Sequence, residues 1–197
     1  MKHVIAIALL AFAINVRAEL DIGKPAPDFE LRAEDGKFYS LKKFRGKTVV
    51  LEWLNHGCPF VRKHYDSGNM QKLQATYTEK DVVWLSIVSS APGKQGHVDA
   101  SGAFREKQEY SSKATKILLD PDGKVGSAYS AKTTPHMYII DESGILLYKG
   151  AIDSISSADK GDIEKADNYV ALALDQKMAN KPIKVSSTKA YGCSVKY

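Results

Sequence analysis

The chain has 197 residues, of which 44% are hydrophobic and 26% charged, values typical of a single globular domain. They exclude a collagen-like, coiled-coil or wholly disordered chain. The net charge of +5 is spread without a long basic run, so neither nucleic acid nor a membrane surface is an expected partner. Two cysteines exclude a disulfide-rich scaffold and form no paired array for structural zinc, so no metal site is expected.

The first 18 residues have the layout of a secretory signal peptide. A basic start at Lys2 precedes the apolar run 4–14, which is too short to span a membrane. The residues before Glu19 predict cleavage after Ala18. We therefore expect an exported protein, periplasmic or secreted, with no membrane anchor after cleavage. In such an oxidising compartment a disulfide can persist.

Strand and helix patterns then alternate along the chain. Residues 29–41 predict a β-hairpin around a turn at 34–36, and the apolar run 48–54 predicts a buried central strand. A helix is expected to begin at Cys58 or Pro59 and to bend or break at Gly68. Residues 82–88 predict a second buried strand.

The second half continues this alternation and closes with a hairpin. A helix is expected over 103–110, a short strand over 117–119, and two strands over 137–140 and 145–148. Apolar residues at helical spacing predict a final helix over 163–178, which Pro182 ends. The order β-β-β-α-β-α-β-α-β-β-α predicts an α/β three-layer sandwich with a mixed sheet and an N-terminal hairpin. We expect one domain over 19–180 and a tail over 181–197 that docks on it.

Cys58 lies where the strand 48–54 gives way to the following helix. A thiolate at a helix N-terminus faces unpaired N–H groups and the positive end of the helix dipole, which lower a cysteine pKa. Pro59 favours the first helical turn and keeps the thiol at its rim. The position predicts a nucleophilic thiol, and the alternative is a buried structural cysteine.

Three motifs in order carry a resemblance to known proteins. They are GKPAPDF at 23–29, WLNHGCPFV at 53–61 and TPHMYIID at 134–141. Together they resemble the thioredoxin fold, and within it the redoxins of the alkyl hydroperoxide reductase/thiol-specific antioxidant (AhpC/TSA) group. The segment CPFVRKHY and the ending YGCSVKY are similar to a subgroup of exported redoxins.

The resemblance implies roles for individual residues. Cys58 matches the attacking thiol, and Pro135 matches the cis-proline that packs beside it. A cis-proline exposes the backbone of the preceding residue, Thr134, for strand-like pairing with an extended substrate. Glu52, six residues before Cys58, matches the buried acid that relays protons, and burial would raise its pKa. The alternative for Glu52 is a solvated side chain.

Two histidines are further candidates near the thiol. His64 follows Cys58 by six residues, where related oxidoreductases often carry a glutamate, so it could tune the thiol pKa or shuttle a proton. His136 follows the expected cis-proline and is expected to lie near Cys58. Otherwise each is a partly exposed polar residue without a role.

The sequence also departs from the family pattern. Val61 stands where the second cysteine of C-x-x-C belongs, so no local disulfide can form, and either Cys193 or an external thiol must resolve the mixed disulfide. Leu51 and Asn55 replace the proline and threonine of a peroxidatic site, although the Asn55 amide could supply one hydrogen bond.

The leading function is therefore a thiol-dependent oxidoreductase that acts on protein or small-molecule thiols and disulfides without a cofactor. A peroxidase, in which Cys58 first becomes a sulfenic acid, is a related alternative. The alternatives from other classes are a copper-binding protein using Cys58, Cys193 and His136, and a binding module stapled by a Cys58–Cys193 disulfide.

Overall fold

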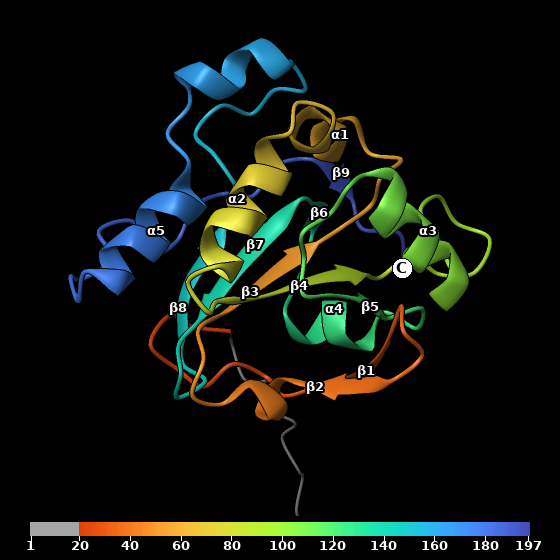
Figure 1. The fold of residues 1–197 in the computed structure, drawn as a ribbon, viewed down its shortest axis with the longest axis horizontal. Helices are drawn as coiled ribbons and strands as arrows, with labels where there is room; N and C mark the ends of the chain where they lie inside the picture. Colours follow the sequence, from red (N-terminus) through yellow and green to blue (C-terminus); the bar gives the residue numbers. More distant parts are fainter. Residues whose placement is uncertain (1–19) are drawn as a thin grey trace, which may run out of the picture.

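A mixed β-sheet organises the chain (Figure 1). The computed structural model describes residues 20–197, so the predicted signal peptide lies outside the described residues. Within this range one sheet has seven strands, in the spatial order β2 (Phe38–Ser40), β1 (Glu30–Ala33), β5 (Lys116–Leu119), β4 (Val83–Val88), β3 (Val49–Trp53), β7 (His136–Ile140), β8 (Leu146–Gly150). The pairs β3·β4 and β4·β5 are parallel and the other neighbours are antiparallel, as expected for the α/β mixed sheet.

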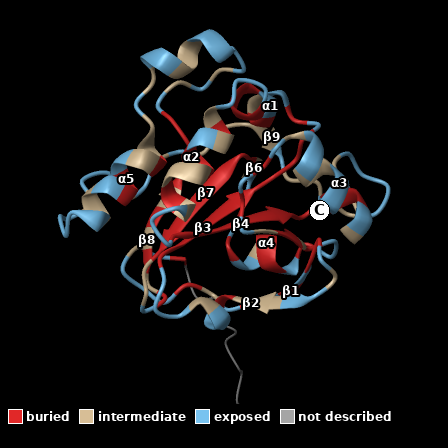
Figure 2. Cartoon of the chain, in the orientation of Figure 1, coloured by how far each residue is buried: buried red, intermediate tan, exposed pale blue. Residues whose placement is uncertain are grey.

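The central strands β3 and β4 are buried along their whole length (Figure 2). Their parallel pairing requires a crossover, which α1 (Pro59–Tyr65) and α2 (Asn69–Thr78) supply. The break between these helices falls at Gly68, whose φ of 76° lies in the left-handed region that favours glycine. The expected break at Gly68 is confirmed.

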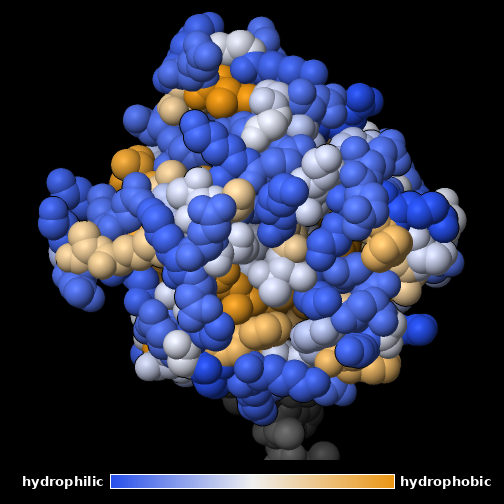
Figure 3. All heavy atoms as spheres, viewed as in Figure 1, coloured by the Kyte–Doolittle hydropathy of each residue, from blue (hydrophilic) through white to orange (hydrophobic). Residues whose placement is uncertain are grey.

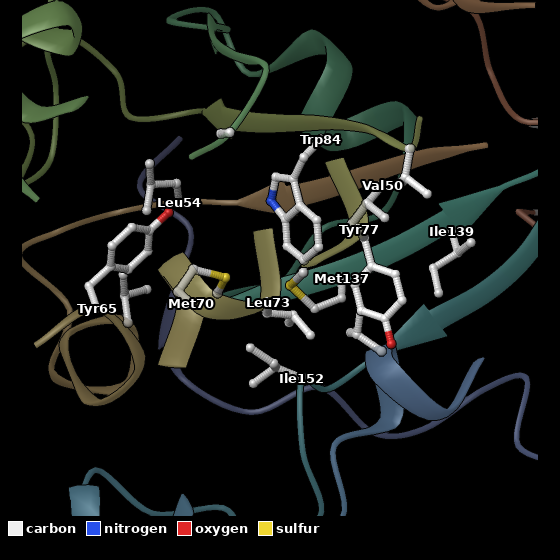
Figure 4. Close-up of a cluster of buried hydrophobic side chains, with 14 of the residues drawn as sticks. Val50, Leu54, Tyr65, Met70, Leu73, Tyr77, Trp84, Met137, Ile139 and Ile152 are labelled. Carbon is white, nitrogen blue, oxygen red and sulfur yellow. The ribbon is translucent and has the colours of Figure 1, made fainter. Parts of the chain in front are cut away.

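Helices cover the two faces of the sheet unequally. α1, α2, α5 (Tyr169–Met178) and Ala103 of α3 (Ala100–Glu109) pack on one face, against β-strand side chains that include Trp84 and Met137 (Figure 4). The other face is covered by α4 (Lys124–Ala128), the short 3₁₀ helix η1 (Leu41–Phe44) and the chain that precedes β1. The three layers are therefore present, and the second helical layer is thin.

Two helix starts differ from the sequence prediction, because capping residues set them. α3 begins at Ala100, earlier than predicted, since the Asp99 side chain caps it by accepting a hydrogen bond from Gly102 N. The last helix begins only at Tyr169, where Asn168 is the N-cap. Residues predicted to form its first turns instead form a 3₁₀ helix, η2 (Lys160–Lys165).

The C-terminal segment, residues 181–197, lies against the domain and adds a second, two-stranded sheet in which β9 (Cys193–Ser194) pairs with β6 (Thr133–Thr134). Upstream, Ser187 bridges to Lys149 of β8. At the end of the chain, the Tyr197 hydroxyl donates to the Ala131 carbonyl at 2.8 Å. These contacts span the segment, and no local sequence pattern predicted the β6–β9 pair.

The face shown in Figure 3 is largely hydrophilic. Large hydrophobic side chains that remain exposed lie on separate elements, for example Phe38, Phe104 and Leu172. Among residues 20–197, no helix has both the length and the apolar character needed to cross a membrane.

Candidate active site

Cys58 is the N-cap of α1, with Pro59 at the first helical position. Its side chain is completely buried. The preceding loop is shaped by Asn55, whose carbonyl accepts from Cys58 N at 3.0 Å and whose side-chain oxygen accepts from Gly57 N at 2.9 Å. The Asn55 amide nitrogen donates to the Gln95 carbonyl at 3.2 Å. Both ends of this amide therefore help to shape the loop.

The second part of the site is the turn before β7. The Thr134–Pro135 peptide bond is cis, as the resemblance implies. The Cys58 thiol donates to the Thr134 carbonyl at 3.0 Å, which places the thiol beside this turn. The Thr134 hydroxyl is buried and has no hydrogen-bond partner among residues 20–197.

Cys193 completes the site from the C-terminal segment. In the β6–β9 pair it lies directly opposite Thr134, and its backbone N–H points to the Cys58 sulfur at 3.4 Å. Both cysteines are free thiols in this structure. The segment therefore brings together two cysteines that lie far apart in the sequence. It also occupies the Thr134 backbone that was expected to pair with an extended substrate.

The two thiols have opposite pKa shifts. Burial acts to raise the pKa of Cys58, but hydrogen bonds outweigh it and leave that pKa below its ordinary value of 9.0. These bonds come from the side chain and N–H of Cys193 and then from the Val61 N–H. Burial, together with the hydrogen bond to Cys58 and its charge, raises the pKa of Cys193 to about 11. Cys58 is thus favoured as the thiolate, and Cys193 as the protonated donor.

This arrangement predicts how the Cys58 pKa responds to changes at position 193. In Cys193→Ala the thiolate loses a side-chain donor, so we expect its pKa to rise, whereas Cys193→Ser keeps a donor and should raise it less. Thiolate absorbance at 240 nm followed against pH measures the difference, and each variant has only one thiol. An equal Cys58 pKa in the two variants would show that the Cys193 side chain does not stabilise the thiolate.

Glu52 lies in the middle of β3 and is completely buried. Its carboxylate accepts hydrogen bonds from Trp84 Nε1 at 2.8 Å, Ser86 Oγ at 2.9 Å and Tyr65 Oη at 3.0 Å. Gln74 Nε2 donates at 3.2 Å. Burial raises the pKa of this carboxyl, and the hydrogen bonds oppose the rise. These bonds do not involve a cysteine, so the proton-relay role stays a prediction.

Among residues 20–197, neither histidine is a hydrogen-bond partner of the Cys58 thiol. His136 hydrogen-bonds through Nδ1 with Tyr138 Oη and Lys132 N, and Tyr138 belongs to the hydrophobic cluster on the opposite face of the sheet from Cys58. The expectation that the His136 side chain lies near Cys58 is wrong, because alternation along β7 turns it to the other face. His64 is buried, with Nδ1 2.8 Å from Asn69 Nδ2 and Nε2 3.7 Å from Asp153.

A buried charged cluster that the sequence analysis did not identify holds the C-terminal segment. Lys63 Nζ lies 3.0 Å from Asp153 Oδ2, and both side chains are buried. Tyr191 lies two residues before Cys193, and its hydroxyl donates to the other Asp153 oxygen. We call Lys63, Asp153 and Tyr191 the Lys63 cluster. Its members come from three distant parts of the chain, so no local signal could have revealed it.

A cysteine at the start of a helix, beside a cis-proline and against a mixed sheet, defines the class of thioredoxin-fold redox proteins. An uncharacterized conserved protein from Geobacillus kaustophilus shares the fold, with a TM-score of 0.77 at 23% identity over 91% of this chain and 94% of its own. A putative thiol:disulfide interchange protein DsbE from Chlorobium tepidum has a TM-score of 0.51 at 26% identity, covering 66% of this chain and 85% of its own.

Residues 22–149 match the AhpC/TSA family, and the chain belongs to it. The thioredoxin-like protein YneN of Bacillus subtilis (strain 168) is 31% identical over 124 residues, which cover 63% of this chain and 68% of that protein. The thiol:disulfide interchange protein DsbE of Escherichia coli (strain K12) is 28% identical over 135 residues, 67% of this chain and 66% of that protein. Membership of the AhpC/TSA group, which the sequence motifs indicated, is therefore confirmed.

Proposed function

We propose that the protein is a thiol–disulfide oxidoreductase in which Cys58 attacks a substrate disulfide and Cys193 resolves the product within the same chain. The thiol-dependent oxidoreductase class follows from the AhpC/TSA membership and from relatives named as thiol:disulfide interchange proteins. The assignment of the two residues rests on one observation, the contact of Cys193 N with the Cys58 sulfur at 3.4 Å. In a chain with Val61 at the usual second-cysteine position, Cys193 takes over the resolving role.

The proposed steps are those of ordinary thiol–disulfide exchange. The Cys58 thiolate attacks one sulfur of the substrate disulfide, forms a mixed disulfide and releases the other substrate sulfur as a thiolate. Cys193, after losing its proton, attacks the Cys58 sulfur and releases the second substrate thiolate. The substrate is reduced by two electrons and the Cys58–Cys193 pair is oxidised to a disulfide. The same steps run backwards when the pair starts oxidised and the substrate is a dithiol.

The substrates are thiols and disulfides small enough to reach a buried sulfur, or larger ones after the C-terminal segment moves away. Peroxide is less favoured, because Leu51 and Asn55 stand where a peroxidatic site has proline and threonine. A copper site made with His136 finds no support either, because that side chain lies on the other face of the sheet. Export to an oxidising compartment is part of this proposal, since an external disulfide or oxidant must be available to the pair.

A redox titration tests the proposal and separates it from a structural disulfide. After oxidation of the purified chain, non-reducing peptide mapping should detect a Cys58–Cys193 bridge. A cycling pair should have a potential above about −250 mV, whereas inert structural bridges lie below about −300 mV. The absence of any such bridge under every oxidant would mean that the resolving thiol comes from a partner, and a potential below the lower limit would mean that the bridge is structural.

Glu52 offers a separate test of the proton relay. Glu52→Gln keeps the shape of the side chain but cannot exchange a proton, so we expect resolution to slow by about a hundredfold or more, in the range of general acid–base effects. Stopped-flow measurement of resolution between pH 5 and 9 is the readout, with Gln74→Glu as a check on the shared hydrogen-bond network. Unchanged rates across this range in Glu52→Gln would make Glu52 purely structural.

A further inference from the structure

A pocket of about 560 Å³ lies at the seam between the C-terminal segment and the domain, within the size range of small-molecule sites. One wall is formed by residues 187–190 of that segment. The opposite wall comes from residues on and before β7 and from Lys149 of β8. Neither cysteine lines this pocket, so it is distinct from the candidate active site.

The charged residues that line the pocket are all basic. Lys132, Lys149 and Lys189 line it, and no aspartate or glutamate is among its lining residues. In the described part of the chain, none of the three lysines forms a salt bridge. Lys149 Nζ donates to the Leu20 carbonyl, at 2.5 Å. Three lysines that line one pocket without an acidic lining residue favour an anionic ligand.

His136 adds a directed donor to this pocket. The residue is only 9% exposed, and its Nδ1 accepts a hydrogen bond from Lys132 N at 3.3 Å. Burial first, and then the charges of Lys132 and Lys149, lower the pKa of His136 to about 4, so the ring is neutral near pH 7. With Nδ1 as acceptor, the proton lies on Nε2, which has no hydrogen-bond partner among residues 20–197.

We propose that this pocket binds a small organic dianion, a dicarboxylate or a phosphate monoester. Lys132 and Lys149 of the domain and Lys189 of the C-terminal segment neutralise its charges, and His136 Nε2–H donates to one of its oxygens. Because residues 187–190 supply one wall, the ligand binds only when the segment is docked. By linkage, the ligand stabilises the docked position of Cys193 to the same extent.

Titration calorimetry of the reduced chain with succinate tests the site. The matched probe is 1,4-diaminobutane, which has the same four carbons and the opposite charge, and inorganic phosphate separates the two ligand sources. We expect saturable binding of succinate or phosphate and none of the diamine. Lys132→Gln combined with Lys149→Gln should weaken binding by at least about tenfold, since the two changes remove two charged hydrogen-bond donors to the ligand.

The matched control is Lys94→Gln combined with Lys124→Gln, which changes the net charge equally at two exposed positions outside the pocket. Affinity in this control should stay within about twofold of wild type. The ¹⁵N signal of His136 Nε2 should shift on titration, which places the ligand in the pocket. The proposal is overturned if neither anion binds saturably, if both double variants lose affinity equally, or if the His136 signal does not respond.

Tyr191→Phe tests the link to the C-terminal segment, because it removes only the hydroxyl that donates to Asp153. Hydrogen exchange of residues 187–194 reports whether the segment has loosened. If Tyr191→Phe does not loosen the segment, Lys63→Met is used as the second variant. A looser segment should bring a weaker succinate affinity. Unchanged affinity with a loosened segment would show that residues 187–190 are not part of the site.

Discussion

Cys58→Ser is expected to abolish thiol–disulfide turnover. A serine hydroxyl cannot replace the thiolate in attack on sulfur, and loss of a catalytic nucleophile lowers rates by roughly a thousandfold or more. Reduction of hydroxyethyl disulfide, a substrate small enough for a buried thiol, measures the effect under conditions in which the background reaction is subtracted. Residual turnover close to that of the wild type would assign the chemistry to another group.

Cys193→Ser is the paired variant, and it should fail at a different step. Cys58 can still attack, but no second thiol in the chain can release the product, so the mixed disulfide accumulates. Mass spectrometry under non-reducing conditions should then find one substrate half attached through Cys58, and added thiol should restore turnover. If Cys193→Ser turns over normally without added thiol, the resolving thiol does not come from the C-terminal segment.

Lys63→Met is expected to have the largest effect on stability. The side chain is buried and pairs with Asp153 at 3.0 Å, so its loss leaves a carboxylate without its counter-charge inside the protein. Removing one partner of a buried ion pair costs about 3–5 kcal/mol of unfolding free energy. Urea denaturation of the reduced protein gives this difference. Because Tyr191 shares Asp153, we also expect faster hydrogen exchange around Cys193 in this variant.

Lys124→Met is the matched control for this prediction. Lys124 also pairs with an aspartate, Asp122, but its side chain is 84% exposed. Exposed pairs contribute little, so the control should leave the unfolding free energy close to that of the wild type. Equal, small losses in the two variants would show that the Lys63 cluster does not stabilise the fold or hold the C-terminal segment.

Several features follow from the sequence alone because their causes are local. The apolar run 48–54 contains the whole of β3, and the helix after Cys58 begins at Pro59 and breaks at Gly68. Strand burial, proline at a first helical turn and glycine in a left-handed conformation all depend on neighbours within a few residues. The position of Cys58 at a helix N-terminus was therefore predictable, and with it a thiol suited to act as a nucleophile.

Tertiary structure decided what surrounds that thiol. The pairing of β9 with β6 brings Cys193 to Cys58, and no residue near either cysteine specifies which segments pair. The register of β7 turns His136 to the opposite face, since a shift by one residue exchanges the two faces of a strand. Likewise the partner of Lys63 lies ninety residues away, and only the packed fold makes a buried lysine tolerable there.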